Sequence, residues 1–250
     1  MIKTLCLGDT GCLGSQVARR TTYHVGHLQF DITCRQSITT ILEKYRPNVV
    51  INCVGMVKER VVPETAFITV NALGPWHLRH ECERVGTKLL QVSTDCVFAG
   101  KLKYPLTYNE SHFANPTDVY GRSKLLGEAG HVTVRSSFIG QGKYGLLHWL
   151  LTTKTDTLNG YINAMWSGLT APVLADVLYE ISQHMDKYPN LIHVHGECIS
   201  KFSLLGMLNQ RFRLGKFIQP VDKPVINRCL SSNYEQPAEI PMLPDAIGAL

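Results

Sequence analysis

The chain lacks any hydrophobic run of the length that crosses a membrane. A spanning helix needs about 20 predominantly apolar residues in succession, and polar or charged residues interrupt every apolar stretch of this sequence. No basic and apolar leader opens the chain, as it would in a secreted protein. We therefore expect a cytoplasmic protein that has no membrane partner.

Basic residues are also not concentrated anywhere. The formal net charge is +5, and no run of Lys and Arg is dense, whereas nucleic-acid-binding chains gather these residues into patches. We expect no nucleic-acid partner and interpret the small positive excess as mild attraction for anionic ligands.

The cysteines lack the spacing of a metal site. Eight of them stand at positions 6, 12, 34, 53, 82, 96, 198 and 229, and no two form a C-x-x-C pair. The ten histidines show no ligand spacing beyond His193 and His195. This pattern excludes a zinc knuckle, so we expect no metal. We also expect reduced thiols in a cytosol-like compartment, several of them buried.

What the chain has is a regular alternation of strand-like and helix-like segments. The expected strands are 2–7, 24–29, 49–53, 88–93, 132–135 and 191–195, and the expected helices are 13–20, 37–45, 63–85, 119–129, 146–152 and 171–184. Pro75 predicts a kink or a break in the third helix. The alternation predicts an α/β fold, a Rossmann-type doubly wound parallel sheet with helices on both faces.

Three glycines directly follow the first expected strand, in the spacing G-x-x-G-x-x-G. Glycine permits a tight turn and a close approach of the backbone to a pyrophosphate, and the N-terminus of the next helix attracts phosphate. An isolated match is equally well explained by a structural turn, but its position between strand and helix favours dinucleotide binding. The predicted phosphate-binding residues are Gly8, Thr10, Gly11, Cys12, Leu13 and Gly14.

A hydroxyl, a phenol and an ammonium follow later in the chain. Thr94 ends an apolar run, and Tyr120 and Lys124 stand at i and i+4 of an expected helix, on one face. We expect the ammonium to lower the pKa of the phenol from about 10 towards the working pH. Tyr-x-x-x-Lys alone often arises by chance on solvated helices, so the pair gains weight only beside a nicotinamide site.

Together these segments resemble the extended short-chain dehydrogenase/reductase family, and within it the dTDP-4-dehydrorhamnose reductase branch. The resemblance covers residues 1 to about 139 and is looser at 160–170 and 227–232. It is carried by Arg46-Pro47-Asn48-Val49-Val50-Ile51-Asn52-Cys53-Val54-Gly55, Val70-Asn71-Ala72-Leu73-Gly74-Pro75, Ser93-Thr94-Asp95-Cys96-Val97-Phe98 and Asn115-Pro116-Thr117-Asp118-Val119-Tyr120-Gly121-Arg122-Ser123-Lys124.

The resemblance implies a reductase that uses NADPH or NADH on a nucleotide-linked 4-keto-6-deoxy sugar, in deoxysugar or surface-polysaccharide synthesis. Residues 1–139 would form the NAD(P)-binding domain and 140–250 a substrate-binding lobe, with the strand near 191–196 returning to the first sheet. A nucleotide-sugar epimerase and a non-catalytic binding or regulatory subunit stay open as alternatives. The oligomeric state is also open, with a homodimer as the assembly considered.

The resemblance also implies roles for individual residues around the cofactor. Tyr120 would donate the proton, Lys124 would bind the nicotinamide ribose, and Thr94 would position the keto oxygen. Asn71 would brace the site, unless it is only a buried structural amide. The nicotinamide side would be lined by Gly55, Met56 and Val57, and the adenine would be bordered by Asp31 and Ile32.

The general Rossmann rule would instead place Asp31 on the ribose, and here we follow the resemblance. That choice leaves no identified carboxylate on the ribose. Arg19 and Arg20 remain candidates for a 2′-phosphate or solvated residues at a helix end. The choice between NADH and NADPH stays open.

The substrate side departs from the branch at two positions. Cys96 stands where its members carry Tyr, and Phe138 where they carry Trp, so transfer of the rhamnose substrate is weakened. Related dehydratases carry Glu at the position of Cys96, so this chain lacks their base, and we interpret the thiol as a small filler and not a nucleophile. Substrate contacts are predicted for Thr94, Asp95, Cys96, Phe138, Trp166 and Arg228.

Three of these assignments keep a structural alternative. Asp95 could instead cap backbone N–H groups, and Trp166 could fill the core, which is the role we prefer for Trp149. Arg228 is predicted on the substrate diphosphate because a guanidinium suits phosphate oxygens, with a surface salt bridge as the alternative.

Overall fold

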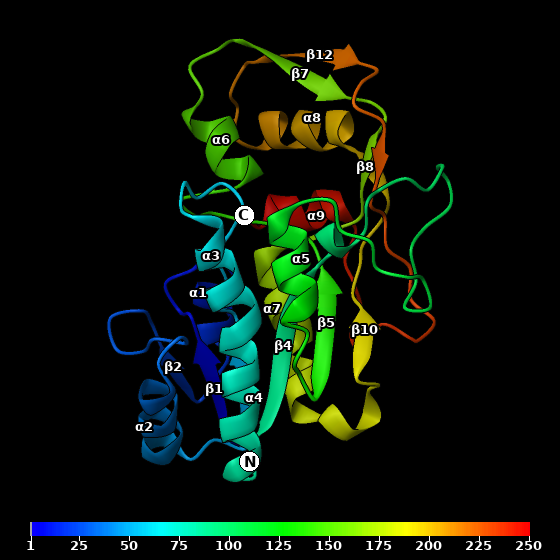
Figure 1. The fold of residues 1–250 in the computed structure, drawn as a ribbon. Helices are drawn as coiled ribbons and strands as arrows, with labels where there is room; N and C mark the ends of the chain where they lie inside the picture. The colour runs from blue at the N-terminus through cyan, green and yellow to red at the C-terminus, as the bar shows by residue number, and fades with distance from the viewer. Residues whose placement is uncertain (1) are drawn as a thin grey trace.

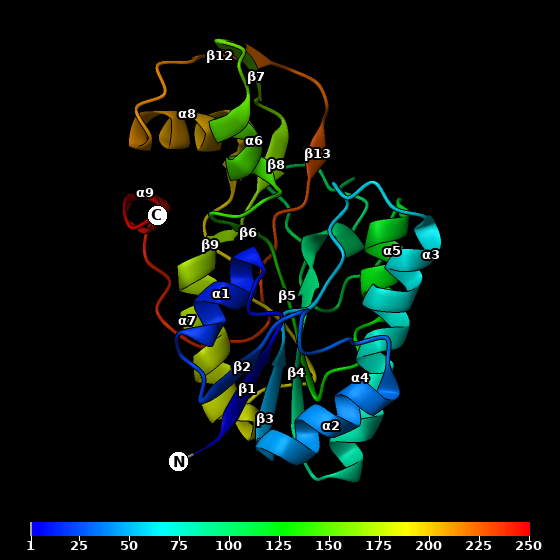
Figure 2. The same cartoon turned by 90° about the vertical axis from the view of Figure 1, so that its left-hand side faces the viewer.

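A six-stranded parallel sheet forms the centre of the computed structural model, which describes residues 2–250. Helices cover both of its faces (Figures 1 and 2). Across the sheet the strands are β10 (Leu191–His193), β5 (Val132–Ser136), β4 (Lys88–Thr94), β3 (Val49–Asn52), β1 (Thr4–Leu7) and β2 (Tyr23–Val25). The predicted doubly wound parallel sheet is confirmed.

Two groups of helices sandwich this sheet. α1 (Cys12–Ala18) and α7 (Ala171–Gln183) pack together on one face, and α2 (Arg35–Tyr45), α4 (Gly74–Arg84) and α5 (Val119–Leu126) lie on the other (Figure 2). Both faces of β1 and β3 are therefore covered, which explains why these strands are buried at every residue.

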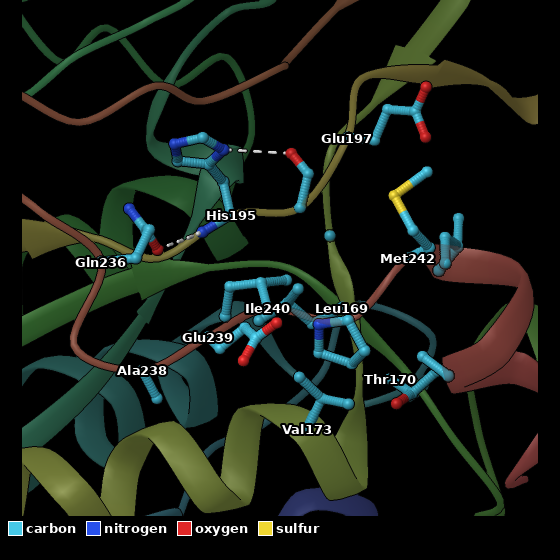
Figure 3. A pocket seen from close by; sticks show the side chains of 15 residues that line it. Leu169, Thr170, Val173, His195, Glu197, Gln236, Ala238, Glu239, Ile240 and Met242 are labelled. Atoms are coloured by element: carbon cyan, nitrogen blue, oxygen red, sulfur yellow. Dashed lines mark hydrogen bonds between the residues drawn. The ribbon is translucent and has the colours of Figure 1, made fainter.

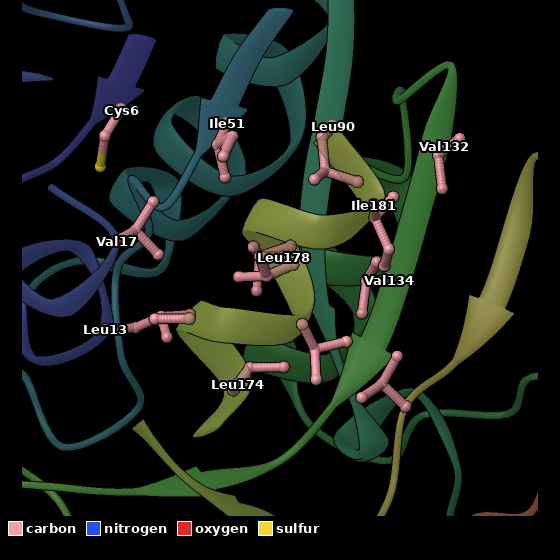
Figure 4. Close-up of a cluster of buried hydrophobic side chains, with 14 of the residues drawn as sticks. Cys6, Leu13, Val17, Ile51, Leu90, Val132, Val134, Leu174, Leu178 and Ile181 are labelled. Atoms are coloured by element: carbon pink, nitrogen blue, oxygen red, sulfur yellow. The ribbon is translucent and has the colours of Figure 1, made fainter. Parts of the chain in front are cut away.

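The largest core cluster lies between the sheet and α7 (Figure 4). Leu174, Leu178 and Ile181 recur at helical spacing along one side of α7 and are fully buried against side chains such as Ile51 and Leu90. Burying each such side chain contributes about 1.5–3 kcal/mol, so this interface holds α7 on the sheet.

The long helical region before β4 does not break at Pro75. α3 (Glu64–Phe67) continues through a π-helical segment, Ile68–Leu73, into α4, and Pro75 lies in the first turn of α4. The wider π turn changes the winding just before the proline, so the chain passes this residue while remaining helical.

The second strand is shorter than the expected 24–29. β2 ends at Val25, and the following residues turn, with the N–H groups of Gln29 and Phe30 donating to the carbonyl of Gly26. The chain then enters α2 and crosses to β3 on the far side of β1. The sheet therefore has one strand beyond β1, where the classical Rossmann order has two.

The rest of the chain forms a lobe above the carboxyl ends of the strands (Figure 1). It contains α6 (Leu146–Thr152), α8 (Lys201–Arg211), α9 (Leu243–Gly248), the pair β7 (Thr157–Tyr161) with β12 (Phe217–Val221), and the sheet β11 (Ile199–Ser200), β8 (Ala164–Trp166) and β13 (Ile226–Asn227). A parallel pair, β6 (Phe138–Ile139) with β9 (Leu169–Thr170), joins the lobe to the main sheet. β10 pairs with β5, so the chain returns from the lobe to the main sheet.

One cysteine pair corrects the expectation of reduced thiols throughout. Cys198 and Cys229 form a disulfide with 5.6 Å between their Cα atoms, while the other six cysteines are free. The pair is 31 positions apart in sequence, and only the pairing of β11 and β13 with β8 brings it together. The spacing of the cysteines therefore contained no signal for it.

Within residues 2–250, no helix has the length and apolar character required to span a membrane.

Candidate active site

The carboxyl end of β4 carries the first candidate residue. Thr94 is the last residue of this strand and is 7% exposed. Its hydroxyl accepts the N–H of Cys96 and donates to a carboxylate oxygen of Asp95, both at 3.2 Å. This local turn places the hydroxyl at the strand ends, where open parallel sheets bind their ligands.

α5 brings the phenol and the ammonium to this turn. Asp118 caps the helix by accepting the N–H of Gly121 at 2.7 Å. A Cβ on Gly121 would lie 2.3 Å from the carbonyl oxygen of Cys96, so only glycine lets α5 pack this closely. Tyr120 and Lys124 consequently lie beside the end of β4.

Lys124 is buried, and a hydrogen bond to a strand of the sheet holds its amine in place. Its Nζ donates to the carbonyl of Val92 at 2.7 Å, and the residue is 8% exposed. Burial lowers the pKa of this amine to about 8, and the nearby Glu128 carboxylate acts in the opposite direction.

A buried ion pair near Lys124 was not predicted from the sequence. Arg135 of β5 donates two hydrogen bonds to Glu128, at 2.8 and 2.7 Å, and Ser93 adds a third at 2.7 Å. Arg135 is 5% exposed, and an unpaired charge at that depth would be costly. The sequence contained one signal for this ion pair: an arginine inside an expected core strand needs a carboxylate partner.

The expectation for the pKa of Tyr120 is wrong for the protein alone. Burial raises the pKa of this phenol above its usual value, the thiol of Cys96 and the carboxylate of Asp95 raise it further, and the Thr94 hydroxyl lowers it. The ammonium of Lys124 points at the carbonyl of Val92, so it does not offset the cost of desolvation. Tyr120 is therefore held as a neutral proton donor.

Asn71 braces the segment that follows β3. Its amide accepts the N–H of Met56 at 2.7 Å, donates to the carbonyl of Met56 at 3.0 Å, and donates to the hydroxyl of Ser123 at 3.1 Å. A Cβ on Gly55 would lie 3.7 Å from Nζ of Lys124. The segment of Gly55, Met56 and Val57 therefore lies beside Lys124, and Asn71 ties it to α5.

The glycine turn after β1 is tightly built. Gly8 has a φ of +91°, and a Cβ on Gly14 would lie 2.0 Å from the carbonyl oxygen of Gly8. A Cβ on Gly11 has its nearest neighbour at 3.3 Å, and this residue is exposed. Gly8 and Gly14 are thus needed for the turn. At Gly11, which stands exposed at the start of α1 beside Thr10, Cys12 and Leu13, a side chain would crowd the carbonyl oxygen of Gly8 less severely.

The residues predicted around the adenine and the ribose have different surroundings. Asp31 lies six positions after the end of β2, where its carboxylate accepts the N–H and the hydroxyl of Thr33 at 2.8 and 2.7 Å. Ile32 is buried against α4. Arg20 is paired with Asp176 of α7, with one contact at 2.9 Å, so it joins two helices and is not a free phosphate ligand.

Two of the substrate candidates meet directly. The guanidinium of Arg228 donates to the carbonyl of Phe98 at 3.0 Å and to the thiol of Cys96 at 3.4 Å. Burial raises the pKa of Cys96 to about 12, which agrees with a filler and not a nucleophile. The carboxylate of Asp95 is 5% exposed and, among residues 2–250, accepts a hydrogen bond only from Thr94, so it does not serve as a backbone cap.

The aromatic candidates differ in how deeply they are buried. Trp166 is 3% exposed in the core of the lobe, donates to the hydroxyl of Ser137 at 2.8 Å, and is covered by the amine of Lys201. Phe138 is partly buried against the main core. Trp149, for which we preferred a core position, is 43% exposed, so that preference is wrong.

A pocket of about 360 Å³ lies away from this cluster, between the start of α7 and α9 (Figure 3). It is lined mainly by apolar side chains such as Val173, Ile240 and Met242, and none of Thr94, Tyr120, Lys124 and Arg228 contributes to it. His195 lies at its rim, while His193 is fully buried and contacts carbonyl groups. Among residues 2–250, no group of His, Cys, Asp or Glu could hold a metal ion.

The candidate site thus combines a buried hydroxyl, a neutral phenol and a sheltered amine at the carboxyl edge of a parallel sheet. A phenol in this position can give a proton to a carbonyl oxygen that accepts hydride on its carbon. This fold and this set of residues define the extended short-chain dehydrogenase/reductase class.

Within that class, a family model described as the RmlD substrate binding domain matches residues 2–138. The match covers more than half of the chain, which therefore belongs to this family.

Individual relatives agree with the assignment. The chain is 37% identical over 134 residues to a dTDP-4-dehydrorhamnose reductase of Streptomyces griseus, covering 50% of this chain and 43% of that relative. It is 27% identical over 266 residues to a dTDP-4-dehydrorhamnose reductase of Aggregatibacter actinomycetemcomitans, covering 96% and 89%. The chain thus spans less than half the length of the Streptomyces relative.

Solved structures share the whole fold. The dTDP-4-dehydrorhamnose reductase of Bacillus anthracis str. Ames, in complex with NADP, superimposes with a TM-score of 0.85 at 18% identity, covering 99% of this chain and 98% of that one. At that identity the likeness shows the fold alone.

Proposed function

We propose that this protein is an NAD(P)H-dependent reductase of a nucleotide-linked 4-keto-6-deoxy sugar, acting in deoxysugar or surface-polysaccharide synthesis. The observation that carries the proposal is the meeting of Thr94, Tyr120 and Lys124 at the carboxyl edge of the sheet, where only β3 separates β4 from β1 and the glycine turn that follows it. Relatives named as dTDP-4-dehydrorhamnose and dTDP-4-keto-6-deoxy-D-glucose reductases support the substrate class.

The residues present fit a dinucleotide cofactor. Gly11 is exposed at the start of α1, and at Gly55 no side chain stands between the backbone and Nζ of Lys124. The glycine turn would hold the pyrophosphate, and Asp31 with Ile32 would border the adenine. The reduced nicotinamide supplies the hydride, and the NADP and NAD complexes of structural neighbours support this cofactor class.

The side chains of this protein would control the proton. Tyr120, neutral because burial raises its pKa, would donate to the keto oxygen while Thr94 holds that oxygen in place. Lys124 would bind the nicotinamide ribose, and its charge would stabilise the phenolate that forms. Asn71 fixes the segment after β3 relative to α5 by hydrogen bonds to both, which supports this arrangement.

The substrate would lie between the carboxyl ends of the strands and the lobe. Arg228 already contacts Cys96, two residues after Thr94, and would bind the diphosphate with its remaining N–H groups. Cys96 and Asp95 would contact the sugar. Phe138, which is partly exposed, and Trp166, which is packed in the core of the lobe, would line the sugar pocket.

The assembly and location belong to the same proposal. Leu73, Trp76 and Leu126 are exposed on neighbouring helices of one face, and a homodimer would bury them. A cytoplasmic location follows from the proposed pathway, although the disulfide between Cys198 and Cys229 is unusual for that compartment.

The decisive experiment is a panel of nucleotide-linked 4-ketosugars, each tested for oxidation of NADPH and NADH. We expect at least one to be reduced, and Tyr120→Phe to lower kcat on the order of a hundredfold while cofactor binding is retained. Net consumption of the reduced cofactor separates a reductase from an epimerase, which consumes none. Tight ligand binding without turnover would point to the non-catalytic subunit, and near-normal activity of Tyr120→Phe would reject the mechanism.

A further inference from the structure

The structure assigns a second anion-binding residue to the substrate site: Lys201, acting beside Arg228, binds the diphosphate of the nucleotide-linked substrate. This assignment rests on the proposed function for the identity of the substrate. Its physical basis is the three-stranded sheet of the lobe, which no sequence motif identified.

The sheet of the lobe places the two cations on either side of one residue. Met165 of β8 pairs with Ser200 on one side and with Asn227 on the other. Lys201 directly follows Ser200, and Arg228 directly follows Asn227. Adjacent strands lie about 4.8 Å apart, so the two backbones are roughly 10 Å apart, within joint reach of two long side chains.

The disulfide holds the same two segments together. Cys198 lies three residues before Lys201, and Cys229 directly follows Arg228. The bond therefore limits the separation of the two cations independently of the short strands between them. A clamp held in this way loses less conformational entropy when a ligand binds.

Lys201 occupies an unfavourable position for the protein alone. It is the first residue of α8, where the helix dipole disfavours a positive charge. Its amine lies 4.9 Å from the ring centre of Trp166, and in the part of the chain that the structure describes no carboxylate forms an ion pair with it. An incoming anion would supply the missing partner.

The charged groups around Lys201 favour an anion. Burial lowers the pKa of its amine to about 8; Asp95 and Cys96 act to raise it, and Lys58 and Arg228 lower it further. Among the groups that act on the pKa of Lys201, two other cations, Lys58 and Arg228, thus outnumber the single carboxylate of Asp95. A diphosphate, with several acceptor oxygens, satisfies more than one of these cations at once.

The test is calorimetric binding of dTDP, which needs no turnover. We expect the wild-type protein to bind dTDP and Lys201→Met to weaken binding by about tenfold or more, the scale of one charge-assisted hydrogen bond. Lys201→Arg should restore most of the affinity. Lys154→Met removes an exposed amine in the same lobe and should leave dTDP binding unchanged.

Two further readouts separate ligand binding from a structural role. The melting temperature of Lys201→Met should be equal to or higher than that of the wild type, because an unpaired, partly buried charge is removed. Wild-type affinity for dTDP should fall above pH 8 as Lys201 loses its proton, since the terminal phosphate is already ionised there. In Lys201→Arg the affinity should stay level up to about pH 9.5, because arginine keeps its charge.

The assignment is overturned if Lys201→Met binds dTDP within about twofold of the wild type, or if the wild type does not bind dTDP. A lower melting temperature of Lys201→Met with unchanged dTDP affinity would identify a structural residue. If dTDP binding is lost in Lys201→Met while no ketosugar is ever reduced, the anion site stands and the reductase proposal is rejected.

Discussion

At the scale of the residue, burial decides the protonation states on which the proposed chemistry depends. Tyr120 is kept neutral, and Lys124 has a pKa of about 8, so the phenol holds a proton that it can give away. Residues that take no part in the proposed proton transfer make the supporting hydrogen bonds. One of them is Asn71, which joins two segments of the site.

The glycines of the turn after β1 have different roles. Gly11→Val should abolish NADPH binding in calorimetry, because the side chain would occupy the space proposed for pyrophosphate. The melting temperature should fall moderately, because a Cβ there would lie 3.3 Å from the carbonyl oxygen of Gly8, which is a tight contact with the backbone, so binding is compared at a temperature where both proteins are folded.

Gly206→Val provides the matched control for this substitution. Gly206 lies in α8 with nothing near its Cβ position, so that variant should bind NADPH normally. Equal NADPH affinity of Gly11→Val and the wild type would show that the pyrophosphate does not bind at this glycine turn.

At the scale of the element, short strands of the lobe determine which distant residues meet. β11 and β13 have two residues each, too few for a pattern in the sequence to predict them. Their pairing with β8 nevertheless brings together the disulfide, Lys201 and Arg228.

The disulfide should contribute measurable stability. It closes a loop of 31 positions, for which the chain-entropy model gives about 3–4 kcal/mol. The double variant Cys198→Ala and Cys229→Ala should lose about this much free energy of unfolding in denaturant titrations without reductant. Cys34→Ala, which removes an exposed free thiol, should change little.

A reductant gives a second test of the disulfide. Dithiothreitol should lower the stability of the wild type to that of the double variant and leave the double variant unchanged. Wild-type stability that does not respond to dithiothreitol would show that the bond does not form in solution.

At the scale of the whole molecule, two ligands would bind in different layers. The cofactor would lie along the strand ends and the glycine turn, and the substrate diphosphate would contact the lobe. The two sites meet only at Thr94 and Tyr120, where the reacting groups come together.

This separation predicts the kinetics of Arg228→Ala. KM for an accepted ketosugar should rise strongly and kcat should change less, because a diphosphate away from the reacting carbon is held similarly in the ground and transition states. Free dTDP should compete with the ketosugar and not with NADPH. Competition with NADPH alone, or an unchanged KM in Arg228→Ala, would remove Arg228 from the substrate site.

The sequence by itself determined the parts of the protein that depend on local patterns. Buried parallel strands read as continuous apolar runs, the glycine turn follows the first of them directly, and Tyr120 and Lys124 lie one helical turn apart. These features need only neighbouring residues, so the doubly wound sheet and the shared helix face of Tyr120 and Lys124 could be predicted.

The tertiary structure alone decided what depends on distant residues. The pKa of Tyr120 follows from how deeply α5 packs against β4, the pairing of Cys198 with Cys229 from two short strands, and the pairing of Arg20 with Asp176 from the contact of α1 with α7. Desolvation and pairing depend on the sum of surrounding atoms, and that sum exists only once the chain has folded.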